Sequence, residues 1–215
     1  GVIVMIHRDL ILPVPVLLID DQLEASQNLS HILQNFGYPK EVLLCSSSLA
    51  NAVSMVQQHL PNLVFINLQS WLKAQIDFIQ NLKLFRKDTL IVAVLPSSMP
   101  KQLLQAIHLG ISAYVFSDQT ATGMQNQIRT ILRGGSPLDG NLANEILACE
   151  QSIVAHDHSL TLSKTEHEIL ALSGQGLPSQ QVAANLNASE QLVHGYVKSI
   201  YRKIMNADDA MGCFS

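Results

Sequence analysis

The sequence predicts two joined domains, a doubly wound α/β domain with a five-stranded parallel sheet and a small all-α domain after it. In the first 134 residues, short apolar runs alternate with stretches of helical periodicity. From residue 159 onward, the patterns are those of short helices. A breaker cluster, Gly-Gly-Ser-Pro at 134–137, separates the two parts.

Five apolar runs have strand length and are rich in Val, Ile and Leu. They are continuous rather than alternating, which is typical of strands covered on both faces. The predicted strands are residues 14–19, 41–45, 63–68, 90–95 and 113–116. Between them, apolar residues recur at spacings of three, four or seven, which indicates helices that turn one side toward a sheet.

Polar residues follow two of these strands at the edge where doubly wound folds place their sites. Asp20 and Asp21 end the first run, and Asn67 ends the third. Because the carboxyl ends of parallel strands meet at one edge, we expect these three side chains to lie together.

Composition excludes several classes of protein. With 47% hydrophobic and 14% charged residues, the chain is folded material, and its net charge of -4 argues against indiscriminate nucleic-acid binding. The apolar runs are too short to span a bilayer, so we expect a soluble cytoplasmic protein. The three cysteines and eight histidines show no metal-binding or catalytic spacing. We therefore expect no enzyme activity and no cofactor.

Three stretches resemble the signature segments of response-regulator receiver domains, which have the flavodoxin/CheY-like fold. They are residues 15–21, 61–68 and 110–116. The resemblance implies that an acidic pair and an acceptor aspartate hold Mg²⁺, while a Ser/Thr and a Lys at the ends of the fourth and fifth strands contact the phosphoryl group. By position, these roles fall on Asp20, Asp21, Asn67, Pro96 and Ser117.

Only the acidic pair matches the receiver pattern. Asn67 is a poor nucleophile, Pro96 has no hydroxyl and Ser117 carries no charge. This joint loss predicts a natural pseudo-receiver that is not phosphorylated. Asp20 and Asp21 either retain a weak, vestigial Mg²⁺ site or only solvate the end of the strand. Tyr114 is the equivalent of the aromatic residue that switches rotamer in the family, and here we expect it to pack in one rotamer.

The C-terminal part resembles the LuxR-type helix-turn-helix domain of the NarL/FixJ subfamily. A short helix over 138–149, followed by a polar connection, resembles the linker of that subfamily. Ser163 is a predicted N-cap that forms a capping box with Glu166. The predicted helix-turn-helix consists of a helix over 180–186, a turn at 187–188 and a recognition helix over 189–204. The predicted boundaries are 1–12 for an N-terminal extension, 13–134 for the pseudo-receiver, 135–158 for the linker and 159–215 for the helix-turn-helix domain.

The recognition helix and its surroundings carry the residues that we predict to contact DNA. They are Lys164, Gln191, His194, Gly195, Lys198, Arg202 and Lys203. Basic side chains of this kind hold phosphates, while the residues of the helix that enter the major groove read bases. The alternative is that the three basic residues near the helix end form an ordinary charged face and that His194 is simply solvated.

These observations lead to a phosphorylation-independent transcriptional regulator as the first hypothesis. Its expected partner is double-stranded promoter DNA, and we expect a homodimer formed mainly by the receiver. A second hypothesis is a protein-interaction adaptor or anti-regulator with little DNA affinity. A third is a pseudo-receiver that senses a small molecule.

Overall fold

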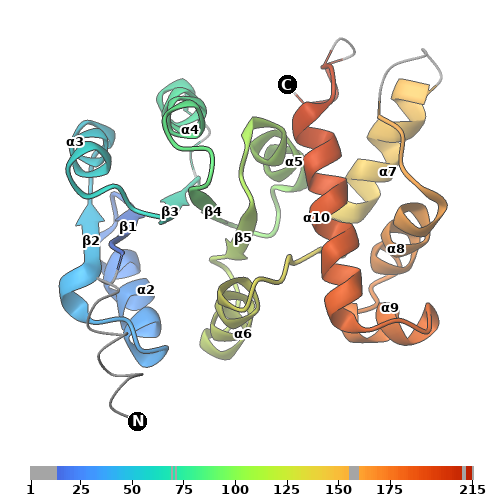
Figure 1. Cartoon of the computed structure of the whole chain (residues 1–215), viewed down its shortest axis with the longest axis horizontal. Helices are drawn as coiled ribbons and strands as arrows, with labels where there is room; N and C mark the ends of the chain where they lie inside the picture. The colour runs from blue at the N-terminus through green and yellow to red at the C-terminus, as the bar shows by residue number, and fades with distance from the viewer. Residues whose placement is uncertain (1–13, 69, 71, 155–159, 210–211, 215) are drawn as a thin grey trace, which may run out of the picture.

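The N-terminal domain is built on five parallel strands in the order β2-β1-β3-β4-β5 (Figure 1), as predicted. The computed structural model describes residues 14–68, 70, 72–154, 160–209 and 212–214. The predicted N-terminal extension, residues 1–12, lies outside this part of the chain. The strands are β1 (Val16–Ile19), β2 (Leu43–Ser46), β3 (Leu63–Asn67), β4 (Leu90–Leu95) and β5 (Ala113–Phe116).

Helices cover both faces of this sheet. On one face lie α3 (Leu49–His59), α4 (Lys73–Phe85) and α5 (Pro100–Leu109), and on the other lie α2 (Leu23–Asn35) and α6 (Ala121–Leu132) (Figure 1). A short 3₁₀ turn, η1 (Lys40–Val42), precedes β2. Successive strand residues enter opposite layers: Leu17 packs in the first core cluster, and Leu18 packs in the second. Continuous apolar runs result because both faces are buried.

Register places the candidate site residues side by side. Ile19 of β1 is the partner of Ile66 of β3. The residues that follow, Asp20 and Asn67, therefore emerge together at the carboxyl edge. The chain leaves β1 toward β2 on one side, whereas β3 lies on the other, so this edge is the switch point of the sheet.

Four helices form the C-terminal part: α7 (Gly140–Val154), α8 (Lys164–Gly174), α9 (Ser179–Asn185) and α10 (Glu190–Asn206). Ser163 caps α8 in a capping box with Glu166, as predicted. The turn between α9 and α10 contains Asn187 with a φ of 51°, a left-handed conformation that asparagine tolerates better than most residues.

The short linker helix that we predicted is α7, which is longer than expected and packs against α8 and α5. It continues to Val154, so the polar connection predicted to begin at residue 150 starts later. A Cβ on Gly140 would lie 2.7 Å from the backbone oxygen of Ser173, and Asn144 Nδ2 donates to Gly174 O at 3.2 Å. Because Gly140 and Gly174 carry no side chain, α7 and α8 approach each other closely. This contact packs α7 with the C-terminal helices.

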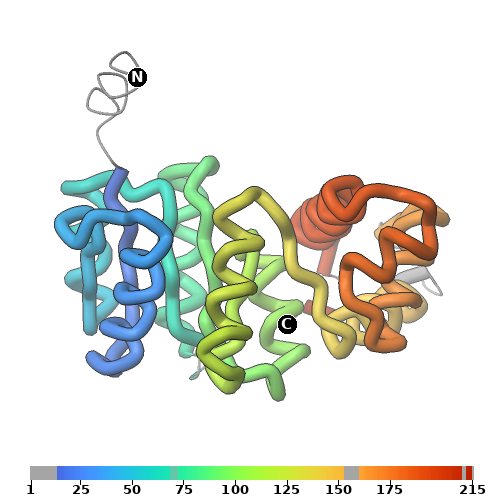
Figure 2. The backbone as a smooth tube through the Cα atoms, turned by 90° about the horizontal axis from the view of Figure 1, so that it is seen from below, coloured from blue at the N-terminus to red at the C-terminus, as the bar shows by residue number. Residues whose placement is uncertain are grey.

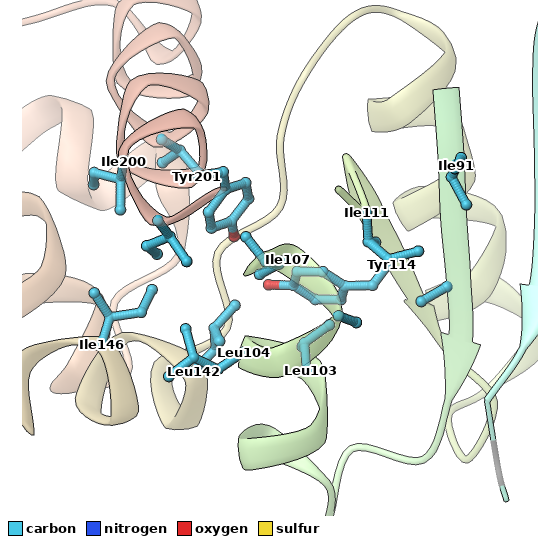
Figure 3. Close-up of a cluster of buried hydrophobic side chains, with 14 of the residues drawn as sticks. Ile91, Leu103, Leu104, Ile107, Ile111, Tyr114, Leu142, Ile146, Ile200 and Tyr201 are labelled. Carbon is cyan, nitrogen blue, oxygen red and sulfur yellow. The ribbon is translucent and has the colours of Figure 1, made fainter. Parts of the chain in front are cut away.

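The two parts of the chain share one apolar core rather than being separated by a loose hinge. α5 contributes Leu103, Leu104 and Ile107, which lie among side chains from α7 and α10 (Figure 3). Ile146 and Ile200 are fully buried in the same cluster. The recognition helix is therefore packed beside the N-terminal domain (Figures 1 and 2).

Candidate functional site

The carboxyl edge of the sheet holds a hydrogen-bonded pair in the place where the receiver pattern has two carboxylates. Asn67 Nδ2 donates to Asp20 Oδ2 at 2.8 Å, and the other oxygen of Asp20 accepts from Gln22 N at 2.8 Å. Asn67 is only 9% exposed. Its amide nitrogen is a donor and not a nucleophile, so the pair is suited to mutual stabilisation and not to phosphoryl transfer.

These residues do not fit a Mg²⁺ site as they lie. Octahedral Mg²⁺ requires oxygen ligands, whereas Asn67 turns an N–H group toward the carboxylate of Asp20. Asp21 is exposed. Among the residues that the structure describes, no three His, Cys, Asp or Glu side chains gather in a metal-binding group. The weak site at Asp20 and Asp21 stays a prediction without geometric support.

The remaining predicted pocket residues divide into two groups. Ser117 lines a cavity together with Asp20 and Asn67, whereas Asp21 and Pro96 are not part of its lining. Next to Pro96, Ser97 Oγ donates to Asp118 Oδ2 at 2.8 Å, and Ser97 N donates to Asp118 Oδ1 at 3.0 Å. These hydrogen bonds lower the pKa of Asp118. Sequence reasoning missed this pair, which ties together the loops after β4 and β5.

Gln75 supports the site from the start of α4. Its Nε2 donates to the backbone oxygen of Asn67 at 2.8 Å. This contact fixes the end of β3 from the helix that follows it along the chain.

Tyr114 is fully buried at the junction of the two domains. Its hydroxyl accepts a hydrogen bond from Asp139 N at 2.7 Å, and the ring packs beside α5 (Figure 3). Burial raises its pKa far above the ordinary value for tyrosine. Tyr114 is buried in this structure, and that it keeps a single rotamer stays a prediction.

Tyr201 of α10 meets Tyr114 from the opposite side. Its hydroxyl donates to Pro137 O, and the hydroxyl groups of the two tyrosines point toward each other (Figure 3). Burial also raises the pKa of Tyr201, and the nearby Tyr114 adds to the shift. The two rings therefore join β5, the connection before α7 and the recognition helix at one point, which the sequence did not reveal.

The recognition helix α10 begins after Ser189, the first residue of the predicted helix, whose Oγ accepts from Leu192 N at 3.1 Å. Its apolar side is buried through Val193, Val197, Ile200 and Ile204. Of the residues predicted to contact DNA, those that are exposed are Lys164, Gln191, Gly195, Lys198 and Arg202.

Lys203 is held inside the C-terminal part of the chain. Its Nζ lies 2.9 and 3.0 Å from the two carboxylate oxygens of Glu166, whose side chain is 4% exposed. Ser199 Oγ donates to the same carboxylate at 3.2 Å. Lys203 therefore balances a buried charge between α8 and α10, which the spacing of basic residues along one helix could not indicate.

His194 contacts the connection between the domains. Its Nδ1 lies 2.9 Å from Ser136 O, and its Nε2 lies 3.8 Å from the carboxylate of Glu190. The side chain is 15% exposed, so the simple solvated role that we considered for His194 does not describe it. The histidine instead contributes to the placement of α10 against residues 134–136.

Lys198 and Arg202 face a groove whose other wall belongs to the N-terminal domain. This groove, of about 310 Å³, is also lined by Lys83 and residues of the connection such as Gly134 and Ser136. A second hollow, of about 630 Å³, brings Gln191, Gly195 and Lys198 opposite Arg133. In this arrangement, the predicted DNA-contacting side of α10 lies close to other basic side chains of the same molecule.

Comparison with known proteins identifies the C-terminal helices. Residues 160–211 match the family described as "Bacterial regulatory proteins, luxR family", so these helices form a LuxR-type domain. Over most of its length, the chain is similar to proteins described as response regulators.

Two relatives illustrate the similarity. The chain is 25% identical to the nitrate/nitrite response regulator protein homolog of Haemophilus influenzae, covering 88% of this chain and 89% of the relative. It is 20% identical to the nitrate/nitrite response regulator protein NarP of Escherichia coli, covering 89% of each. A structure of the RcsB response regulator of Salmonella typhimurium shares the fold with a TM-score of 0.52, 16% identity and coverage of 94% of this chain and 96% of that one.

Within the described part of the chain, no helix has the length and apolar character needed to cross a membrane.

Proposed function

We propose that this protein is a DNA-binding transcriptional regulator whose N-terminal domain controls it without phosphorylation. The observation that carries the proposal is the pairing of Asn67 with Asp20 at 2.8 Å. A neutral amide stands where the receiver pattern has the acceptor carboxylate, and its N–H group, which cannot bind Mg²⁺, is the one turned toward Asp20. Pro96 lacks the hydroxyl, and Ser117 lacks the positive charge, that contact the phosphoryl group in the receiver family.

The family match and the relatives support the DNA-binding part of the proposal. DevR/DosR of Mycobacterium tuberculosis, 23% identical over 74% of each chain, is described as a DNA-binding transcriptional activator. In this chain, the exposed Gln191, Lys198 and Arg202 on α10, together with Lys164 at the start of α8, supply polar and basic groups for bases and phosphates. We propose a homodimer and a cytoplasmic location on the same basis of resemblance.

The DNA-binding proposal is tested by selecting fragments from genomic DNA with the purified full-length chain, followed by anisotropy titrations at several salt concentrations. We expect binding whose logarithm falls linearly with the logarithm of salt concentration. Lys198→Ala and Arg202→Ala should each reduce the magnitude of that slope by about one. Lys73→Ala is the matched control, because Lys73 is an exposed lysine on α4. The absence of any salt-dependent binding would reject the DNA-binding role.

Phosphorylation independence needs its own test. Acetyl phosphate should leave the mass of the chain unchanged. Neither acetyl phosphate nor beryllofluoride should change its oligomeric state or its DNA affinity. Sedimentation velocity would measure the proposed dimer in the same samples. Incorporation of a stable phosphoryl group, or dimerisation driven by beryllofluoride, would overturn the proposal.

A protein-interaction adaptor is the second candidate, and one observation favours it. Lys203 is paired with Glu166, and His194 contacts Ser136, so two of the predicted DNA-contacting side chains are already engaged within the chain. The basic surface is therefore thinner than the sequence predicted. An adaptor would bind another regulator with an affinity that Lys198→Ala does not change. The same chain would retain no genomic DNA fragments.

A further inference from the structure

A cavity of about 470 Å³ lies between α2 and α6, on the face of the sheet opposite α3, α4 and α5. Figure 2 looks onto this face, with strands passing between the blue α2 and the yellow-green α6. At its bottom, Val94 is partly exposed although its strand, β4, lies inside the sheet between β3 and β5. Solvent therefore reaches an apolar floor that packed helices would normally cover.

The lining of this cavity has a consistent chemical character. The floor and walls are mainly apolar, with Leu18, Leu29, Ile32, Phe65, Val94, Val115 and Met124. Neutral polar groups follow the rim, including Asn28, Asn35, Asn67, Ser117, Gln119 and Gln125. Among the described residues that line the cavity, Asp20 is the one carboxylate, His31 is the one histidine, and none is Lys or Arg.

Charge selects the kind of ligand that this lining favours. An anion such as a phosphate or a carboxylate would meet Asp20 without a lysine or arginine to balance it, and burying such a charge is costly. A cation would find the carboxylate of Asp20, which has lone pairs left after its bonds to Gln22 N and Asn67 Nδ2. The volume lies within the range typical of small-molecule sites.

We propose that this cavity is a binding site for a small organic amine with an apolar body. The ammonium group lies at Asp20, at the carboxyl edge of the sheet, and the apolar body packs over the partly exposed Val94. The inference goes beyond the proposed function, because binding is measured on the chain without DNA. Its failure would therefore leave the DNA-binding tests unaffected.

Three matched probes test the charge requirement: 2-phenylethylamine, 2-phenylethanol and phenylacetate share the same ring and differ in the polar group. Saturation-transfer NMR and thermal unfolding are recorded on the full-length chain with each probe at millimolar concentration. We expect 2-phenylethylamine to give the strongest transfer and a dose-dependent rise in Tm, because it binds the folded state. Phenylacetate should give neither. No transfer from the amine, or equal effects of amine and acid, would overturn the proposal.

Variants locate the site. Asp20→Asn should weaken binding of 2-phenylethylamine at least tenfold, while Asp21→Asn, the neighbouring carboxylate outside the lining, should leave binding as in the wild type. Ala25→Phe is an independent test in case Asp20→Asn impairs folding. It places a ring at the exposed mouth of the cavity and should block binding of the amine. Binding that survives Ala25→Phe, or that Asp21→Asn reduces as much as Asp20→Asn, would contradict the location.

Discussion

At the scale of single residues, Asn67 determines the chemistry of the sheet edge. A carboxylate at this position would face Asp20 across a hydrogen-bond distance, and two like charges at such a separation disfavour each other. The amide replaces that repulsion with a charge-assisted hydrogen bond. An amide at this position thus stabilises the edge where a second carboxylate would destabilise it.

We predict that Asn67→Asp destabilises the fold at neutral pH by about 2 kcal/mol, because it exchanges this hydrogen bond for carboxylate repulsion. The penalty should shrink as the pH falls toward about 4, because repulsion from Asp20 raises the pKa of the new carboxyl group in the folded chain above its ordinary value. Urea unfolding at several pH values measures both effects. Asn62→Asp is the control, because exposed Asn62 already accepts from Arg86 at 2.9 Å and a carboxylate suits that partner. Equal stability of the Asn67→Asp variant and the wild type would contradict the prediction.

A second prediction concerns Lys203. Lys203→Met should cost about 2–3 kcal/mol of unfolding free energy, because it leaves the buried carboxylate of Glu166 without its cation. The exposed Lys198 provides the matched control, and Lys198→Met should change stability by less than about 0.5 kcal/mol. Denaturant titration compares the two variants. A similar small effect for both would show that the pair with Glu166 is not structural.

At the scale of elements, α10 has one side that packs in the core and one side that is predicted to contact DNA. One side is buried against the C-terminal helices, and the other carries Gln191, Gly195 and Lys198. Apart from its two chain neighbours and the backbone of its own helix, nothing in the described chain lies within 4 Å of a Cβ built on Gly195. Packing within this molecule therefore does not explain the glycine, although glycine weakens a helix by about 1 kcal/mol relative to alanine.

We predict that Gly195→Ala raises the unfolding free energy by about 0.5–1 kcal/mol and weakens DNA binding, because the new methyl group enters a surface predicted to approach DNA. Gly140→Ala should instead lower the unfolding free energy, because its Cβ would lie 2.7 Å from the backbone oxygen of Ser173. Thermal unfolding and anisotropy titration measure the two effects. If Gly195→Ala stabilises the chain and leaves DNA affinity unchanged, the glycine has no role in DNA contact.

At the scale of the whole molecule, the recognition helix is packed against the N-terminal domain. His108 of α5 illustrates the contact: its Nδ1 lies 2.8 Å from Ile204 O, and its ring stacks on Phe214 with centroids 4.6 Å apart. An arrangement that places Lys198 and Arg202 beside a groove of the same chain limits their access to a duplex. Separation of the domains would then favour DNA binding by a shift of population.

We predict that His108→Ala raises DNA affinity about fivefold, because the loss of one hydrogen bond and one ring contact weakens the packed arrangement by about 1 kcal/mol. Anisotropy with a selected DNA fragment measures the change. His59→Ala, an exposed histidine on α3, is the control and should leave affinity unaltered. A fall in affinity would indicate that the packed arrangement is the one that binds DNA.

The buried tyrosines predict how the whole fold responds to alkaline pH. The pKa values of Tyr114 and Tyr201 are raised by burial, so the folded chain keeps protons that the unfolded chain releases above about pH 10. Their stabilisation is fully present below that pH and is lost as the pH rises toward the folded values. Unfolding free energy should therefore fall above pH 10, and the double variant Tyr114→Phe, Tyr201→Phe should show a smaller slope. Absorbance at 295 nm should show two of the four tyrosines ionising only on unfolding.

The sequence alone was sufficient for the strands and for the residue types at the edge of the sheet. Apolar runs predicted the ends of every strand to within two residues, and the capping box of Ser163 and Glu166 marked the start of α8. Asp20 and Asn67 could be placed together because strand ends and parallel register are local properties of a repeating fold. Pro96 has no hydroxyl and Ser117 has no charge, and both facts follow from the residue types alone.

Only the tertiary structure decided which side chains are free to act. Lys203 pairs with Glu166 across 37 positions, His194 meets Ser136 across 58, and His108 meets Ile204 across 96. The cavity between α2 and α6 likewise depends on how two helices distant in sequence sit on one sheet. Periodicity and capping follow from neighbours along the chain, whereas these contacts depend on the spatial arrangement of whole elements, which no local pattern specifies.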